Sequence, residues 1–123
     1  MIQVVYWSST GVTKRVAGSL GGIPVDKYQG GKFILLVPSY GAPRTGNHVP
    51  NRVKRFLGEH AALMVGVAGV GNTVFGPEFC LGAVKISERF GVPLLAKIDV
   101  VPTKDQIDAI TNYQRRAEWD SFL

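Results

Sequence analysis

Disulfides, membrane spans and metal clusters are all missing from this sequence. Its single cysteine, Cys80, excludes a disulfide within the chain. No apolar run approaches the roughly 20 residues that a membrane-spanning helix needs. The chain enters an apolar strand pattern at once, without a basic region or cleavage site, so we expect no signal peptide and a cytoplasmic protein. Neither His48 nor His60 has Cys, Asp or Glu at metal-ligand spacing, and we expect both to be exposed.

Acidic residues are also few. Nine Asp and Glu stand against 14 Lys and Arg, which gives a net charge of +5. The basic residues are scattered, and the densest group is Arg52, Lys54 and Arg55. No zinc spacing or alternation of basic and aromatic residues accompanies them, which argues against a nucleic-acid-binding protein. An anionic cofactor or an acidic protein partner explains the charge balance as well. No serine has an evident base beside it, so hydrolase chemistry is not expected.

Strand and helix patterns alternate along the chain. Apolar, β-branched segments predict strands at 2–7, 23–28, 32–37, 62–68 and 94–101. Helices are expected at 12–20, from about residue 50, at 79–90 and at 103–116. This alternation predicts an α/β fold and one domain over 1–123: a flavodoxin-like three-layer sandwich with a five-stranded parallel sheet of order 2-1-3-4-5. For residues 117–123 two alternatives stay open, a loose tail or a segment that packs Trp119 and Phe122 back on the sheet.

A hydroxyl-rich turn of the form S-x-T-G-x-T follows the first strand. Its glycine lets the backbone bend, and the N-terminus of the next helix offers N–H groups and a partial positive charge. We interpret the turn as a phosphate-binding loop, with helix capping as the alternative. The candidate binding residues are Ser8, Ser9, Thr10, Gly11, Val12 and Thr13.

Two further loops, 39–47 and 69–76, follow the third and fourth strands. The order 2-1-3-4-5 brings them to the same edge of the sheet as the first loop. We expect Tyr40 and Phe75 to flank a flat ring there. The candidate cofactor-binding residues in and after these loops are Ser39, Tyr40, Gly41, Ala42, Gly71, Asn72, Phe75, Gly76, Phe79 and Cys80. For the Cys80 thiol itself, packing in the core is favoured over a redox role, because no second cysteine is present.

Several of these segments together resemble the NrdI family, the flavodoxin-like accessory proteins of class Ib ribonucleotide reductase. The stretch G-N-T-x-F-G-x-x-F-C at 71–80 is the most specific, and 5–9, 37–41 and 92–95 also match. The resemblance extends to about residue 112. The first loop departs from it, being one residue shorter than usual, with Val12 where Asn is typical. Its length instead matches the flavodoxin loop.

The resemblance implies bound FMN and, as partner, the small subunit of class Ib ribonucleotide reductase. It also implies that the reduced flavin reacts with dioxygen and supplies the oxidant for the dimanganese–tyrosyl radical cofactor of that subunit. The flavin would carry the chemistry, without catalytic protein side chains, and a further, unidentified partner would reduce it. We expect Arg44, Arg52, Lys54 and Arg55 either to meet acidic groups of the partner or to form a solvated basic face.

The two loops at 39–47 and 69–77 contain no Asp or Glu, and Arg44 lies in the first. Since carboxylates disfavour an anionic reduced flavin, we expect its two reduction steps to lie close together. Three alternatives stay open: a one-electron flavodoxin, a small flavin or quinone reductase, and an adaptor that binds no flavin.

Overall fold

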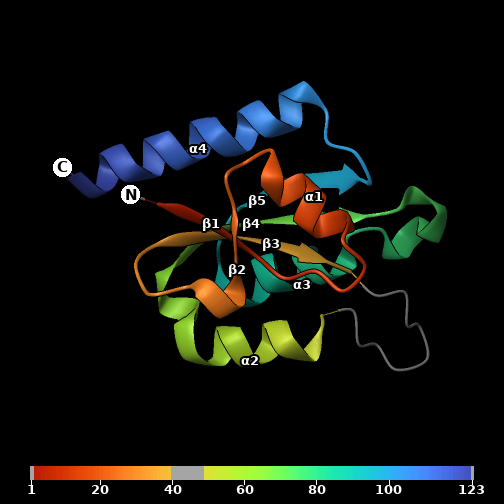
Figure 1. Ribbon diagram of the computed structural model, residues 1–123, viewed down its shortest axis with the longest axis horizontal. Coiled ribbons are helices and arrows are strands. Elements are labelled where there is room, and N and C mark those ends of the chain that lie inside the picture. The colour runs from red at the N-terminus through yellow and green to blue at the C-terminus, as the bar shows by residue number, and fades with distance from the viewer. Residues whose placement is uncertain (1, 40–48, 123) are drawn as a thin grey trace.

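A parallel five-stranded sheet forms the centre of the molecule (Figure 1). The computed structural model describes residues 2–39 and 49–122. The strands are β1 (Gln3–Tyr6), β2 (Ile23–Pro24), β3 (Phe33–Pro38), β4 (Met64–Gly71) and β5 (Leu94–Asp99). They pair in the order β2-β1-β3-β4-β5, with Val5 opposite Leu35 and Leu35 opposite Val67. The predicted fold class and strand order are confirmed.

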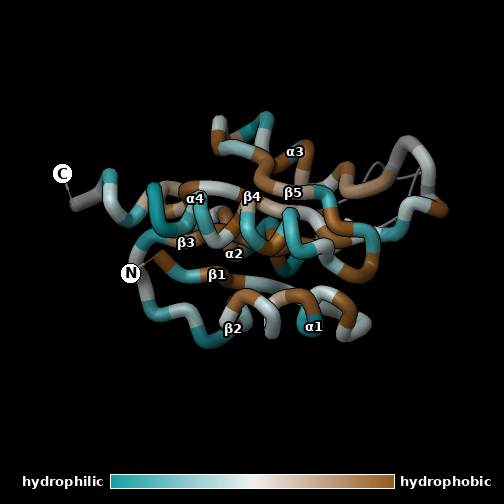
Figure 2. Tube along the Cα trace, turned by 90° about the horizontal axis from the view of Figure 1, so that it is seen from above, coloured by the Kyte–Doolittle hydropathy of each residue, from teal (hydrophilic) through white to brown (hydrophobic). Residues whose placement is uncertain are grey.

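Helices cover both faces of this sheet (Figure 1). On one face α2 (Asn51–His60) and α3 (Leu81–Phe90) bury Phe56, Leu57 and Ile86 against the sheet. On the other face α1 (Val12–Gly18) and α4 (Lys104–Phe122) bury Val16 and Ile110. Hydropathy alternates along α4, as an amphipathic surface helix requires (Figure 2). In the described part of the chain, no helix combines the length and the apolar character needed to cross a membrane.

Several element boundaries differ from the expected ones. β2 has two residues and gives way to a 3₁₀ turn, η1 (Val25–Lys27), because Pro24 lacks an N–H for the ladder. β4 starts after a second 3₁₀ turn, η2 (Ala61–Leu63), and continues to Gly71. The expected loop after it contains a third, η3 (Thr73–Glu78).

The last helix is longer than expected. Thr103 and Gln106 exchange side-chain and backbone hydrogen bonds of 2.9 and 3.2 Å, which confirms the predicted start. The helix then continues to Phe122. Residues 117–122 are therefore helical and do not form a loose tail. Ala117 packs against the core from within this extension, whereas the Trp119 side chain is 61% exposed.

Candidate functional site

The carboxyl ends of β1, β3 and β4 meet at one edge of the sheet, and the segments that leave them carry the candidate residues. Tyr40, Gly41, Ala42 and Arg44 lie outside the described residues, as does the side chain of Phe75. The predicted aromatic pair beside a flat ring therefore stays a prediction.

The loop after β1 is closed by its own serine. The Ser8 hydroxyl accepts a hydrogen bond of 3.0 Å from the Gly11 N–H. Gly11 has φ of 91°, a left-handed conformation that favours glycine, and it precedes α1. No described side chain caps the first turn of α1. Ser8 thus bonds the N–H of the N-cap residue, whereas the N–H groups of the first turn of α1 remain directed out of the helix end.

Thr13 is the unusual residue of this loop. Its side chain is only 2% exposed, yet its hydroxyl forms no hydrogen bond with any residue that the structure describes. A buried polar group without a partner is costly, by about 1–3 kcal/mol, and therefore calls for an explanation. Ser9 and Thr10 are exposed, and Val12 packs against the core, so that Val12 can offer only its backbone. An anion held at the uncapped helix end would suit this donor set.

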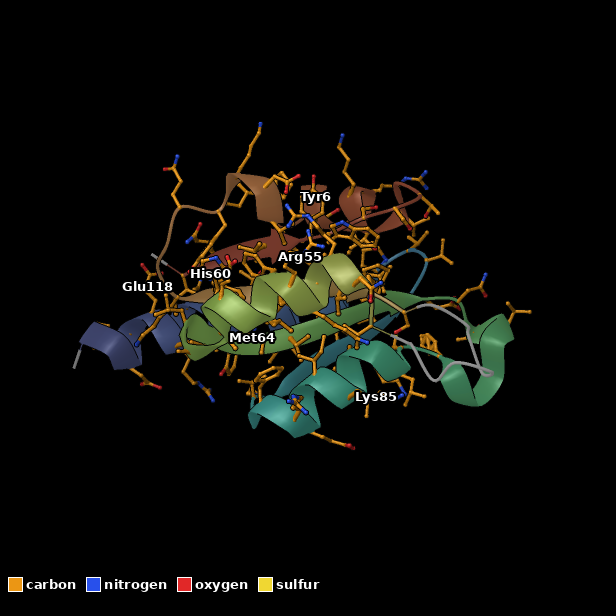
Figure 3. The ribbon with its side chains drawn as sticks, turned by 90° about the horizontal axis from the view of Figure 1, so that it is seen from below. Tyr6, Arg55, His60, Met64, Lys85 and Glu118 are labelled. Carbon is orange, nitrogen blue, oxygen red and sulfur yellow. The ribbon has the colours of Figure 1, made fainter. Side chains whose placement is uncertain are left out.

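A pocket of about 540 Å³ opens beside this loop, lined in part by Tyr6, Trp7 and Lys14. Tyr6 is labelled in Figure 3, near the end of β1. Asp26 and Lys27 of η1 also line this pocket. Asp26 forms an ion pair with Arg52 of α2. Arg52, which we expected to face a partner or solvent, therefore ties α2 to the 3₁₀ turn within the protein.

The segment after β3 supplies one described candidate, Ser39. Its hydroxyl accepts a hydrogen bond of 2.9 Å from the Gly82 N–H in the first turn of α3. Ser39 thus links the end of β3 to the start of a helix more than 40 residues later in the chain. The Ser39 hydroxyl therefore has a hydrogen-bond partner within the protein in the absence of any ligand.

Cys80 lies at the start of α3, with φ of 54° and a fully buried side chain. Burial raises the pKa of its thiol from 9.0 to about 11, and the positive charge of Lys97 lowers this pKa by a smaller amount. A Cβ at Gly69 would lie 2.8 Å from the Ala83 Cβ and 3.0 Å from the Cys80 Cβ. The glycines of β4 therefore let α3 approach the sheet closely. This environment supports a packing role for Cys80.

The loop after β4 is held by the protein's own groups. The Asn72 side chain accepts a hydrogen bond of 3.0 Å from the Val74 N–H. Thr73 donates its N–H and its hydroxyl to the Asp99 carboxylate, at 3.2 and 2.9 Å. Gly76 has φ of 60°, which favours glycine. The half-buried ring of Phe79 has the Lys97 ammonium 5.4 Å from its centroid.

Asp99 is the residue that sequence reasoning missed. The loop itself contains no acid, as noted above, but the end of β5 brings a carboxylate to it. His60 was also misjudged: it is half-buried, with its ring centroid 5.0 Å from that of Tyr28 and 4.8 Å from that of Phe56. Among the described residues no group of His, Cys, Asp and Glu could hold a metal ion.

This sheet order and the loops at its carboxyl edge define a flavodoxin-like α/β protein. Two solved structures share the fold. A short-chain flavodoxin associated with a bacterial microcompartment has a TM-score of 0.68 at 18% identity, over 94% of this chain and 95% of its own. The rubredoxin oxygen:oxidoreductase of Desulfovibrio gigas has a TM-score of 0.60 at 14% identity, over 93% of this chain and 34% of its own.

Sequence comparison identifies the family within this class. Residues 4–112 match the family described as NrdI flavodoxin-like. The Protein NrdI of Brucella ovis is 35% identical, over 91% of each chain. That of Mycobacterium leprae is 36% identical over an alignment 86 positions long, which covers 63% of this chain and 62% of that protein. The chain belongs to the NrdI flavodoxin-like family, and membership supports a flavin cofactor and a role tied to ribonucleotide reductase.

Proposed function

We propose that this protein binds FMN and uses the loop 8–13 to hold its phosphate. The observation that carries the proposal is the buried Thr13 hydroxyl, which lies without a described partner at the uncapped start of α1. A phosphate would accept hydrogen bonds from this hydroxyl and from the N–H groups of Val12 and Thr13. The candidates Ser8, Ser9, Thr10 and Gly11 complete the loop.

We place the flavin ring at the same edge, between the segments after β3 and β4. Tyr40, Gly41, Ala42 and Phe75 are proposed to flank it. Asn72, Gly76 and Phe79 border it from the loop after β4, while Gly71, Ser39 and Cys80 support the backbone there. The role of these residues is to bind and orient the ring and to limit the access of water. When bound, FMN supplies the electron transfer to dioxygen that the protein side chains cannot perform.

The proposed reaction is reduction of dioxygen, with the oxidant passed to the small subunit of a class Ib ribonucleotide reductase. There it would serve assembly of the dimanganese–tyrosyl radical cofactor, and an unidentified reductase would restore the flavin. Asp99 is an acid that the fold brings to the loop after β4, and its carboxylate accepts two hydrogen bonds from Thr73. Because these bonds disperse its charge, we keep the expectation that the two reduction steps lie close together.

The first experiment is titration of FMN into wild-type protein and the variants Thr13→Val and Thr111→Val. Thr13→Val removes the hydroxyl at constant shape, and the lost bond to a charged group predicts about tenfold to hundredfold weaker FMN binding. Thr111→Val, on α4, is the control and is expected to bind as the wild type does. Equal affinity of all three proteins would contradict the phosphate assignment.

A second candidate function, a one-electron flavodoxin, is favoured by the length of the first loop, which matches S-x-T-G-x-T. Activation separates the two. Reduced protein, dioxygen and a manganese-loaded small subunit are mixed, and the tyrosyl radical is measured by electron paramagnetic resonance. A radical that depends on this protein supports the oxidant donor. Flavin binding with no radical, and with electron transfer to a one-electron acceptor, supports the flavodoxin.

A further inference from the structure

A groove of about 570 Å³ opens between α2 and α3 and belongs to none of the loops discussed above. Its floor contains Leu57 of α2 and Ile86 of α3, both buried, and Phe90 lies at one end, 37% exposed. Figure 3 shows the two helices side by side, with Lys85 labelled on α3. The groove follows the later turns of α3, whereas the candidate flavin site lies before its first turn.

Basic residues stand on both walls of this groove. Lys54 lines it from α2, and Lys85 and Arg89 line it from α3, whereas none of its lining residues is acidic. Lys85 and Arg89 are four positions apart, so their side chains extend from the same face of α3 about one turn apart. An apolar floor between basic walls suits a ligand that combines apolar groups with several negative charges.

Gly58 widens the groove on the α2 side. A Cβ at this position would have no atom within 4 Å. Glycine is nevertheless present there, although it costs about 1 kcal/mol relative to alanine in the interior of a helix such as α2. The absence of a side chain at Gly58 therefore leaves open space on the α2 side of the groove.

We propose that the groove between α2 and α3 binds an acidic peptide segment of a partner protein. Apolar side chains of the segment contact Leu57 and Ile86, and its carboxylates face Lys54, Lys85 and Arg89. Carboxylates repeated along a peptide can meet cations on two helices at once, which a compact anion cannot do. The segment would leave the carboxyl edge of the sheet uncovered, and the proposal does not depend on flavin binding.

The test uses a fluorescein-labelled peptide in which Glu and Leu occupy opposite faces of a helix. Binding is followed by fluorescence anisotropy, and amide chemical shifts locate the peptide on the full-length protein. We expect shifts along the second half of α2 and α3, and affinity that falls as salt is raised. The same peptide with Lys in place of Glu should not bind.

Two matched pairs of variants test the site itself. Gly58→Trp fills the groove and should weaken binding by about tenfold or more, whereas Gly58→Ala should change it by less than about twofold. Arg89→Gln removes a wall charge and should weaken binding about fivefold, whereas Arg55→Gln, on α2 but outside the groove lining, should not. Circular dichroism confirms that each variant is folded.

Equal binding by both members of each pair would overturn the proposal, as would chemical shifts confined to other elements. Failure of the Glu–Leu peptide to bind folded wild-type protein at low salt would also overturn it. If decanoate shifts the groove resonances and the peptide does not, the groove takes a small anionic amphiphile instead. FMN binding is measured on the same samples, so that failure of this proposal is distinguished from failure of the flavin assignment.

Discussion

The segment after β1 and the segment after β4 leave the same edge of the sheet, yet their polar groups have different partners. After β4, Asn72 and Thr73 are bonded to neighbouring protein groups, and the Gly82 N–H at the start of α3 donates to Ser39, which follows β3. After β1, Ser9 and Thr10 are exposed, and the buried Thr13 hydroxyl has no described partner. The loop after β4 is therefore preformed by the protein, whereas the loop after β1, apart from the bond between Ser8 and Gly11, keeps polar groups that the proposed phosphate would complete.

The largest expected effect tests how tightly the preformed loop is built. Gly69→Ala places a methyl group 2.8 Å from the Ala83 Cβ in a fully packed layer, which should lower the free energy of unfolding by about 3 kcal/mol. Gly58→Ala, which meets no atom within 4 Å, should raise it by about 0.5–1 kcal/mol. Urea denaturation measures both. A tolerated Gly69→Ala would mean that α3 can move away from β4, and the contrast between the loops would fail.

The pattern of strands and helices was predictable because buried parallel strands and amphipathic helices carry strong local periodicity. The central strand β3 contains Phe33, Ile34 and Leu35, all fully buried, and its place in the sheet follows from such a run. The end of α4 was missed because Arg115 and Arg116 suggested a final turn. The apolar contacts of Tyr113 and Ala117 carry the helix beyond it.

The candidate site could be proposed from the sequence only where it is local in sequence. The loop 8–13 is contiguous, so its hydroxyls and its glycine were identified together. Asp99 could not be identified in this way, because Thr73 lies 26 positions before it and only the sheet brings them together. His60 was misjudged for the same reason, since the Tyr28 ring that it contacts belongs to another element.

The second prediction is that the buried thiol of Cys80 makes the free energy of unfolding depend on pH. Its pKa is raised from 9.0 to about 11 in the folded protein, so the unfolded chain loses this proton first. The contribution is fully present below pH 9.0 and is lost as pH rises towards 11, by roughly 2 kcal/mol. The measurement is the free energy of unfolding against pH for wild type and Cys80→Ala. The wild type should fall more steeply over this range; parallel curves would show that the thiol is not held in a buried, neutral form.

The third prediction compares one threonine from each loop. Thr73→Val removes a hydrogen bond to the Asp99 carboxylate and should lower the free energy of unfolding by about 1 kcal/mol. Thr13→Val removes a buried hydroxyl without a described partner, so the flavin-free protein should be equally stable or slightly more stable. Thermal denaturation without flavin measures both. If Thr13→Val destabilises the protein as much as Thr73→Val does, the Thr13 hydroxyl already has a protein partner.

The smallest expected effect comes from the exposed part of the first loop. Ser9→Ala should change the stability of the flavin-free protein by less than about 0.5 kcal/mol, because its exposed hydroxyl is hydrated both in the folded and in the unfolded protein. With FMN added, the same variant should lose part of the stabilisation that the wild type gains, since ligand binding raises stability in proportion to the logarithm of affinity. The measurement is the shift of the unfolding temperature on addition of FMN, with Ser19→Ala, at the C-terminal end of α1, as control. A loss in the flavin-free protein would mean that Ser9 belongs to a preformed loop like the one after β4. A loss only with FMN would mean that the loop after β1 acquires its order from the ligand.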